Sequence, residues 1–378
     1  MPKQRVLLGM SGGVDSSVSA VLLLEQGYEV IGAFMKNWSG STRTCNGTQE
    51  FVECDWRSER RDAMRVAAQL GIEFVTLDFE KEYREKVVEN LFNEYEAGRT
   101  PNPDVLCNKF VKFDLFVREA DRLGCAFVAT GHYARVEKGS DPVRGQTPFL
   151  KAARDQSKDQ TYFLWAMPKE VLPRVMFPVG DLLKSEVREI ARKHRLSVAE
   201  KKDSMGICFV GEVDIKEFLK ERIKLSPGLI KSTDGRVVGE HEGLAFYTIG
   251  QREGIGSVGG GTPWYVVRKE TVTNTLVVGS EVDPELYSRE LTAGQCNWLT
   301  PRGSDPVRGL TPFSCFARVR YRQPLEPCHV SGAGVRPRTG SDPSSVQFEN
   351  PIRAITPGQS IVFYTEDGTV LGGGIIST

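Results

Sequence analysis

The sequence predicts an α/β protein in which a doubly wound parallel sheet is followed by a small central domain and a carboxyl-terminal β-barrel. Three observations lead to this fold class. Apolar strand patterns alternate with helix patterns over roughly the first 200 residues, glycine-rich short strands follow, and about ninety residues at the end carry strand patterns alone. We therefore expect three domains, at residues 1–212, 213–283 and 284–378.

The first domain is expected to alternate between short apolar strands and helices. The expected strands are Arg5–Met10, Tyr28–Met35, Ile72–Leu77 and Ala126–Thr130. The expected helices are Ser16–Gln26, Asp62–Leu70, Glu80–Ala97 and Lys109–Leu123. This alternation is typical of a parallel sheet with helices on both faces. Later strands are expected at Arg236–Gly243, Trp264–Val278, Phe316–Gln323, Ser345–Ile355 and Ser360–Thr365.

Composition narrows the class of protein. Lys plus Arg (49) balance Asp plus Glu (49), so binding of nucleic acid would depend on local basic stripes rather than on bulk charge. No apolar run approaches the ~20 residues of a membrane helix, and no secretory signal pattern is visible, which predicts a cytoplasmic protein without a membrane partner. The eight cysteines form no CxxC pair and no cluster with histidines, so we expect neither a disulfide framework nor a zinc site.

The segment Ser11–Ser17 follows the first expected strand and opens the first expected helix. Its two glycines let the backbone turn sharply, while the helix amino end presents N–H groups to an anion. The segment lacks the Lys-Ser/Thr ending of a Walker loop, so transfer of a γ-phosphate is not the predicted chemistry. Asp15 suits a magnesium-bridged pyrophosphate, because Mg²⁺ prefers carboxylate and phosphate oxygens. The alternative is a Gly-Gly turn whose serines only cap the helix.

This loop resembles that of the PP-loop ATP pyrophosphatases. The resemblance implies cleavage of ATP between its α and β phosphates and adenylation of an oxygen of the substrate. Asparagine, GMP and NAD synthetases share the motif with several RNA thiolation enzymes. The loop therefore predicts ATP as a ligand and leaves the substrate open.

Two cysteines are candidates for covalent chemistry. Cys107 ends a Pro-rich loop just before an expected helix, where the helix dipole would favour a thiolate. Asp104 lies three residues away as a proton acceptor. Cys208 lies in the small-residue stretch Asp203–Gly211, near the expected domain boundary. For each, a buried small hydrophobic role remains the alternative.

The order of motifs along the chain resembles the bacterial tRNA-uridine 2-sulfurtransferases. Eight segments match that family in order: Gly9–Ser16, Thr100–Asn108, Ala129–Tyr133, Lys158–Gln160, Asp203–Gly211, Thr248–Arg252, Arg320–Gln323 and Thr356–Ser360. The resemblance implies a Rossmann-like PP-loop domain that uses ATP with Mg²⁺ to thiolate the wobble uridine of tRNAs for Lys, Glu and Gln. It also implies an upstream persulfide donor, either a cysteine desulfurase or a sulfur-relay protein.

The resemblance further implies roles for single residues. ATP would be held by Gly9, Met10, Ser11, Gly12, Gly13, Val14, Asp15 and Ser16, with Met35 and Gly131 near the adenosine. The target base would contact Asn102, Pro103 and Asp104. The tRNA would contact His132, Lys158, Asp159, Gln160, Arg320, Tyr321 and Gln359.

The resemblance also implies a mechanism. Cys107 would be the nucleophile and Cys208 the persulfide carrier. Adenylation turns the uracil C2 oxygen into a leaving group. Sulfur then reaches C2 directly from the persulfide, or as sulfide released when Cys107 and Cys208 form a disulfide.

A basic line is expected in the last domain. Along Cys315–Arg322, period two places Arg318, Arg320 and Arg322 on one face of a strand, opposite an apolar face. Such a line suits phosphates, although an arginine-lined face is often only solvated surface. The family resemblance favours contact with tRNA.

One peptide occurs repeatedly between the motifs. Gly139–Phe149 recurs at Gly303–Phe313 with a single change, and Gly340–Pro343 repeats its beginning. We interpret these segments as copied insertions at exposed loop tips, where extra length costs little.

Two other functions stay open from the sequence. A PP-loop enzyme could adenylate a different tRNA base or a metabolite. A tRNA-binding protein with decayed chemistry is the second, against which the presence of Asp15, Cys107 and Cys208 speaks.

Overall fold

A computed structural model describes residues 3–45, 48–53, 56–139, 148–202, 215–220, 222–255, 263–300, 312–332 and 343–377. Cys208 and most of the copied peptide lie outside these ranges, so what the sequence predicts for them remains a prediction.

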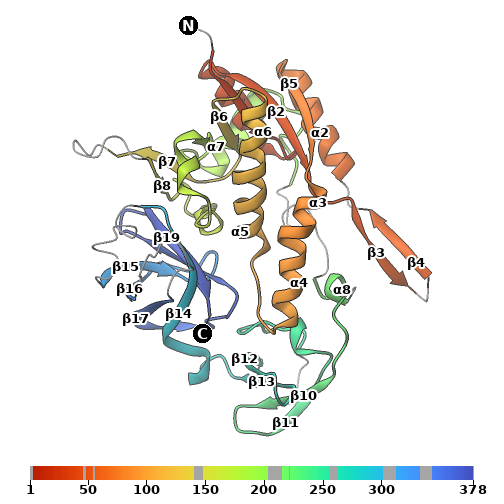
Figure 1. Cartoon of the computed structure of the whole chain (residues 1–378), viewed down its shortest axis with the longest axis vertical. Helices are drawn as coiled ribbons and strands as arrows, with labels where there is room; N and C mark the ends of the chain where they lie inside the picture. The colour runs from red at the N-terminus through yellow and green to blue at the C-terminus, as the bar shows by residue number, and fades with distance from the viewer. Residues whose placement is uncertain are drawn as a thin grey trace.

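The first domain is built on a sheet of five parallel strands (Figure 1). In spatial order these are β5 (Glu73–Asp78), β2 (Glu29–Lys36), β1 (Arg5–Gly9), β6 (Phe127–Thr130) and β9 (Val175–Met176). Successive residues of β1 enter different cores, because Val6 and Leu8 face one cluster of buried side chains and Leu7 faces another. The sheet is therefore covered on both faces, as the sequence predicts.

Helices form the two covering layers. One face carries α1 (Val14–Glu25), α2 (Trp56–Leu70) and α7 (Lys184–Lys193). The other carries α3 (Glu80–Tyr83), η1 (Arg84–Val88), α4 (Glu89–Glu96), α5 (Pro103–Cys107), η2 (Asn108–Leu115) and α6 (Phe116–Arg122). Two small hairpins were not expected from the sequence: β3 (Gly40–Cys45) with β4 (Thr48–Glu53), and β7 (Arg135–Lys138) with β8 (Pro148–Lys151). Short 3₁₀ turns follow at η3 (Thr161–Phe163) and η4 (Lys169–Arg174).

A small central sheet follows α8 (Ile215–Lys220). Its strands run in the order β11 (Val237–His241), β10 (Gly228–Ser232), β13 (Thr275–Gly279) and β12 (Tyr265–Glu270), with η5 (Leu244–Phe246) after β11. The single stretch expected at Trp264–Val278 is thus two antiparallel strands, joined by a turn in which Asn274 has a φ of 47°.

The last part of the chain closes into a six-stranded barrel, which confirms the predicted β-barrel. After η6 (Pro284–Leu286), its strands are β14 (Tyr287–Trp298), β15 (Phe313–Arg318), β16 (Glu326–Ser331), β17 (Ser344–Arg353), β18 (Ser360–Tyr364) and β19 (Val370–Ile376). They close in the order β14-β17-β16-β15-β18-β19.

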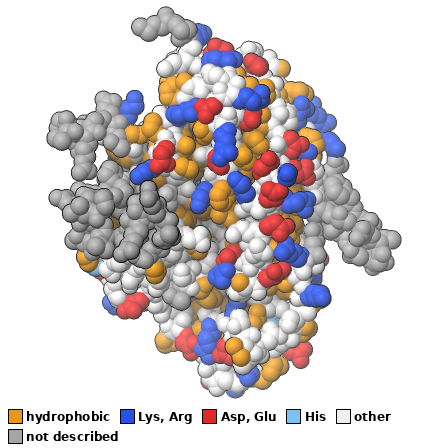
Figure 2. Space-filling view, in the orientation of Figure 1, with side chains coloured by type: hydrophobic (Ala, Val, Ile, Leu, Met, Phe, Trp, Pro, Cys, Tyr) orange, Lys and Arg blue, Asp and Glu red, His pale blue; other side chains and the backbone are white. Residues whose placement is uncertain are grey.

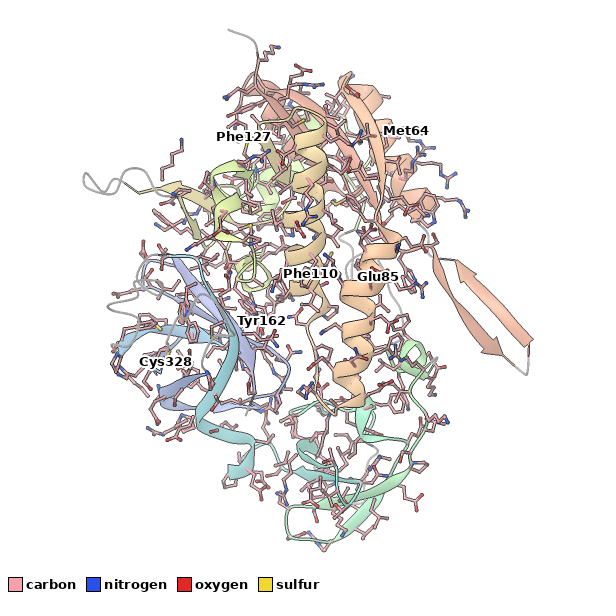
Figure 3. All side chains as sticks on the ribbon, in the orientation of Figure 1. Met64, Glu85, Phe110, Phe127, Tyr162 and Cys328 are labelled. Atoms are coloured by element: carbon pink, nitrogen blue, oxygen red, sulfur yellow. The ribbon has the colours of Figure 1, made fainter. Side chains whose placement is uncertain are left out.

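The barrel packs against the first domain through buried polar contacts. The Tyr162 hydroxyl shares its single proton between two carbonyl oxygens of the barrel, Ser360 O at 2.9 Å and Val319 O at 3.1 Å. Trp165 Nε1 donates to Ser360 Oγ at 3.0 Å. Tyr162 lies where the barrel meets the first domain (Figure 3). Within the described ranges, no helix is both long and apolar enough to cross a membrane.

Candidate active site

The phosphate loop lies between β1 and α1, at the carboxyl edge of the parallel sheet. Gly12 has a φ of +77°, and a Cβ at this position would lie only 2.3 Å from Glu59 O, at the start of α2. Only glycine fits such a turn and such an approach. The sequence therefore folds here into a tight loop, and the start of α2 packs against one side of it.

Two more glycines bring the predicted adenosine residues to the same edge. A Cβ on Gly131, just after β6, would lie 2.7 Å from Ser16 N in the first turn of α1. A Cβ on Gly9 would lie 3.0 Å from Met35 Cε. The ends of β1, β2 and β6 thus meet beside the loop, which is where open α/β sheets bind their ligands.

The loop is internally bonded and suited to an anion. Ser16 Oγ accepts from Ser11 N and donates to Gly13 O, both at 3.2 Å, and Ser17 Oγ donates to Gly13 O at 2.8 Å. Gly13 is the N-cap of α1 and brings no side chain to bond the N–H groups of the first turn. A helix start of this kind fits a phosphate.

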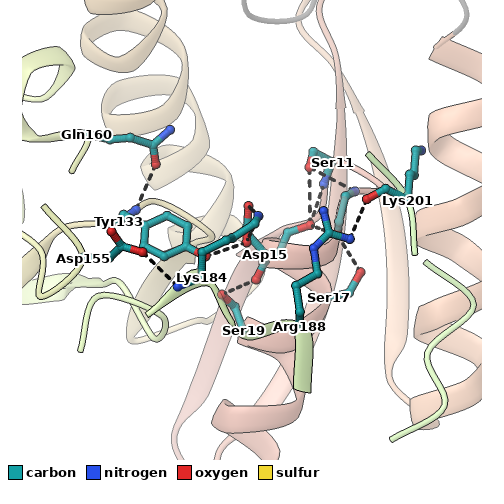
Figure 4. A network of polar contacts seen from close by, with 12 residues as sticks. Ser11, Asp15, Ser17, Ser19, Tyr133, Asp155, Gln160, Lys184, Arg188 and Lys201 are labelled. Atoms are coloured by element: carbon teal, nitrogen blue, oxygen red, sulfur yellow. Dashed lines mark hydrogen bonds and ion pairs between the residues drawn. The ribbon is translucent and has the colours of Figure 1, made fainter. Parts of the chain in front are cut away.

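Asp15 is at the centre of a polar network that Figure 4 shows from close by. Lys184 Nζ lies 2.7 and 2.9 Å from the two carboxylate oxygens of Asp15. The Tyr133 hydroxyl donates to Oδ1 of the same carboxylate at 2.9 Å. Asp155 Oδ2 accepts from the backbone N–H of Lys184 at 2.9 Å, at the first residue of α7. The network therefore places a partly buried ammonium next to the predicted phosphate site.

A second lysine from the same part of the chain reaches the loop. Lys201 Nζ donates to Gly12 O at 3.1 Å and to Asp62 Oδ2 at 2.7 Å. Arg188 holds the backbone of this lysine, because its NH1 donates to Lys201 O at 2.6 Å. Neither Lys184 nor Lys201 lies in a sequence motif that points to phosphate, so sequence reasoning missed both.

Cys107 lies in a helix and not in a loop before one. Asn102 caps α5 by accepting from Val105 N at 3.4 Å, and Pro103 occupies its first turn. The helix therefore begins at Pro103, six residues before Lys109, the start that the sequence predicts. Cys107 is consequently past the first turn, where the helix dipole acts most strongly, and its side chain is fully buried. The helix-terminus argument for a thiolate at Cys107 is wrong.

Asp104 and Cys107 nevertheless share α5. Residues three positions apart lie on the same side of a helix, so both side chains belong to one face. Cys208 lies outside the described residues, and the predicted approach of the two sulfurs remains a prediction.

The predicted tRNA contacts in the first domain divide between interior and surface. His132 is buried and lies between Thr130 Oγ1, at 2.7 Å from Nδ1, and Lys112 Nζ, at 3.2 Å from Nε2. Burial, with the Lys112 ammonium, holds the pKa of His132 well below its usual value. Asp159 is also buried, and burial raises its pKa. Lys158 and Gln160 are partly exposed.

The expected line of three solvent-facing arginines is wrong in its geometry. β15 ends at Arg318, and the chain then turns, with Arg322 at a φ of +67°. Arg318 is buried, 3.7 Å from Asp159 Oδ2, because this side of the barrel faces the first domain rather than water. Arg320 NH2 donates to Thr356 Oγ1 at 2.8 Å, and only Arg322 of the three is exposed.

Charge on the face that carries α4 and α6 is mixed. Figure 2 shows Lys and Arg side chains interspersed with Asp and Glu over the described part of this face.

Tyr321 is half-buried against Phe163, with ring centroids 4.6 Å apart. Gln359 bonds to the segment before α5, through Thr100 O and Pro101 O.

Three family models match successive parts of the chain. They are described as a tRNA methyl transferase HUP domain at residues 4–212, a tRNA methyl transferase PRC-barrel domain at 216–280 and an aminomethyltransferase β-barrel domain at 288–376. Together they match the order of parallel sheet, central sheet and closed barrel in the structure.

Named relatives cover nearly the whole chain. The tRNA-specific 2-thiouridylase MnmA of Geobacillus thermodenitrificans is 48% identical over 98% of this chain and 94% of its own length. That of Halalkalibacterium halodurans is 49% identical over 99% and 95%. A solved 4-thiouridine synthetase in complex with RNA and ATP aligns over 58% of this chain and 50% of its own, with a TM-score of 0.35 and 17% identity. This similarity is too weak to support a conclusion. By its near full-length identity with these relatives, the chain belongs to the tRNA-specific 2-thiouridylase family.

Proposed function

We propose that this protein is an ATP-dependent tRNA-uridine 2-sulfurtransferase acting on the wobble uridine of tRNA. The observation that carries the proposal is 48% identity over 98% of the chain with a relative named tRNA-specific 2-thiouridylase. The phosphate loop supports it, because Gly12, Gly13 and the start of α1 form an anion site at the ligand-binding edge of the sheet.

The chain's own residues have separate tasks in binding ATP, the co-substrate. The N–H groups at the start of α1 would bind its phosphates, with Met35 and Gly131 beside the adenosine. The Asp15 carboxylate would bind Mg²⁺, which prefers such oxygens and screens the charge of the phosphates. Lys184, already bonded to Asp15, would place a positive charge beside the departing pyrophosphate.

The sulfur chemistry needs two thiols and an activated base. Adenylation makes the C2 oxygen of uridine leave as part of AMP. The terminal sulfur of a Cys208 persulfide then forms the bond to C2, and Cys107 breaks the sulfur–sulfur bond at Cys208. Alternatively, Cys107 first releases hydrosulfide, which attacks C2. Either route leaves a Cys107–Cys208 disulfide that a cellular thiol must reduce before the next persulfide forms on Cys208.

Nucleoside mass spectrometry of tRNA tests this function. Cells that lack the gene are complemented with wild type, Cys107→Ser, Cys208→Ser or Cys125→Ser. Cys125 is a buried thiol of the same domain with no proposed role, and serves as the matched control. We expect 2-thiouridine derivatives to return with wild type and Cys125→Ser alone.

Other outcomes separate the alternatives. Unchanged 2-thiouridine in the null strain, with no second enzyme supplying it, contradicts the assignment. Full thiolation by Cys208→Ser with a physiological sulfur donor contradicts the persulfide route. Loss of a different modified nucleoside would instead support a PP-loop enzyme with another target.

A further inference from the structure

The segment that leads into α5 is held from outside its own domain. Residues 99–102 have no regular secondary structure. Thr100 N donates to Pro357 O at 3.0 Å, and Gln359 Nε2 donates to Thr100 O at 2.9 Å and to Pro101 O at 3.1 Å. Three backbone groups directly before the Asn102 cap are therefore bonded by the barrel loop 356–360.

The orientation of the Gln359 amide follows from the chemistry of its partners. Both partners are carbonyl oxygens, which only accept hydrogen bonds, so the amide nitrogen must face them. The two N–H groups of that nitrogen are both used. A contact with a tRNA phosphate through the same nitrogen would have to release the segment before α5.

The barrel loop that carries Gln359 is itself fixed. Gly358 has a φ of +91°, and a Cβ there would lie 2.8 Å from Thr100 O and 2.9 Å from Thr100 N. Gly358 N donates to Ile376 O at 2.9 Å, and Ile376 N donates to Gln359 O at 2.8 Å, which joins the loop to β19. The loop is thus held by β19 and packs directly against the backbone of Thr100.

The central domain reaches the same segment. The hydroxyls of Thr248 and Thr100 lie 3.3 Å apart. Lys269 Nζ donates to Gly98 O at 3.1 Å. Arg320 connects the other two domains, since it donates to Ile249 O and to Thr356 Oγ1. All three domains therefore meet at residues 98–101, immediately before the helix that carries Cys107.

This meeting point lies at the amino-terminal end of α5. α5 continues through η2 into α6 as one helical run, and its first turn, at the Asn102 cap, is the end of that run which these contacts hold. We infer that Gln359 is a positioning residue, which acts through the backbone of Thr100 and Pro101 to orient Asn102, Asp104 and Cys107. The inference rests on the proposed function and assigns Gln359 a task other than contact with tRNA.

Gln359→Glu tests the inference, because it keeps the shape of the side chain and replaces the donor with an acceptor. With saturating tRNA, and with enzyme whose persulfide has been loaded by a cysteine desulfurase and cysteine, we expect the single-turnover thiolation rate to fall about tenfold or more, as for a misplaced catalytic group. The Kd for tRNA should stay within about twofold of wild type, because no tRNA contact is removed. Gln347→Glu, at an exposed glutamine of β17 outside these bonds and outside the eight matched segments, is the charge-matched control.

Alkylation of Cys107 gives a readout that does not require activity. The Cys107 thiol has no exposed surface, so iodoacetamide should label it faster in Gln359→Glu than in wild type or the control. Gly358→Ala removes no side chain yet displaces Thr100, and should reproduce both effects.

Two results would overturn the inference. One is a raised Kd for tRNA in Gln359→Glu with the saturated rate and the Cys107 labelling unchanged, which would make Gln359 a tRNA contact. The other is wild-type rate and labelling in Gly358→Ala. If wild type itself thiolates no tRNA, the proposed function fails, and the labelling of Cys107 still decides whether Gln359 positions α5.

Discussion

Alanine at Gly12 is predicted to combine backbone strain with a steric clash, and a second glycine separates the two effects. Gly12 has a φ of +77°, and its Cβ would lie 2.3 Å from Glu59 O. Gly27 has a φ of +86°, but its Cβ would meet nothing within 4 Å. Gly27→Ala should therefore lose only about 1–2 kcal/mol of stability from the left-handed backbone. Gly12→Ala should lose about 1–3 kcal/mol of stability more, because the atom in its way, Glu59 O, belongs to the backbone, which would have to shift.

Thermal unfolding of the full chain and calorimetric titration with Mg·ATP measure the two consequences. We expect Gly12→Ala to unfold at a clearly lower temperature than Gly27→Ala. The clash displaces the phosphate loop, so the Kd for ATP should rise at least about tenfold in Gly12→Ala, the equivalent of 1.4 kcal/mol. Gly27→Ala should bind ATP as wild type does. Equal loss of stability in the two variants, or wild-type ATP affinity in Gly12→Ala, would refute the steric argument.

Three further predictions follow from single contacts. Lys184→Met should weaken Mg·ATP binding about tenfold to a hundredfold in calorimetry, since a charge-assisted hydrogen bond contributes about 1.5–3 kcal/mol. The control Lys193→Met, at the exposed end of the same helix, should leave this binding unchanged. The folded-state pKa of His132 lies below its unfolded value of 6.5, so stability should be fully present above pH 6.5 and fall below it by up to about 1.4 kcal/mol per pH unit. His132→Asn should flatten this slope in urea titrations at pH 5 to 8, and an unchanged slope would exclude His132 as its source. Tyr162→Phe should cost about 1–3 kcal/mol in the same assay through its bonds to Val319 O and Ser360 O, whereas a neutral result would show that the barrel interface does not depend on them.

The fold was predictable because its strands differ in pattern. β1 and β2 of the parallel sheet are nearly continuous buried runs, since both faces are covered, whereas β17 of the barrel alternates between buried and exposed residues over its first half. The start of α5 was missed, although Asn102-Pro103 is a normal cap and first-turn pair. From the sequence, the Pro-rich segment before Cys107 is interpreted as a loop, and this interpretation places Cys107 outside the helix.

The candidate site was predictable where it is local in sequence. The phosphate loop is one segment whose glycines and serines show its geometry directly. Lys184 bonds Asp15 across 169 positions, and no pattern around it indicates phosphate. Period two predicted the burial of Cys315 and Ala317 correctly, but it carries no information on what covers the other face of a strand. Arg318 is buried there because the first domain packs against the barrel.

The two halves of the proposed reaction depend on different parts of the molecule. Every contact described around the phosphate loop, from Lys184, Tyr133 and Lys201, comes from the first domain. The segment before α5 is instead bonded by Gln359 of the barrel and Thr248 of the central domain. ATP binding should therefore tolerate changes in the barrel loop, whereas sulfur transfer through Cys107 should not. On the proposed function, this division gives both later domains a task although the phosphate site lies in the first: they would hold the helix that carries Cys107 in place for the activated base.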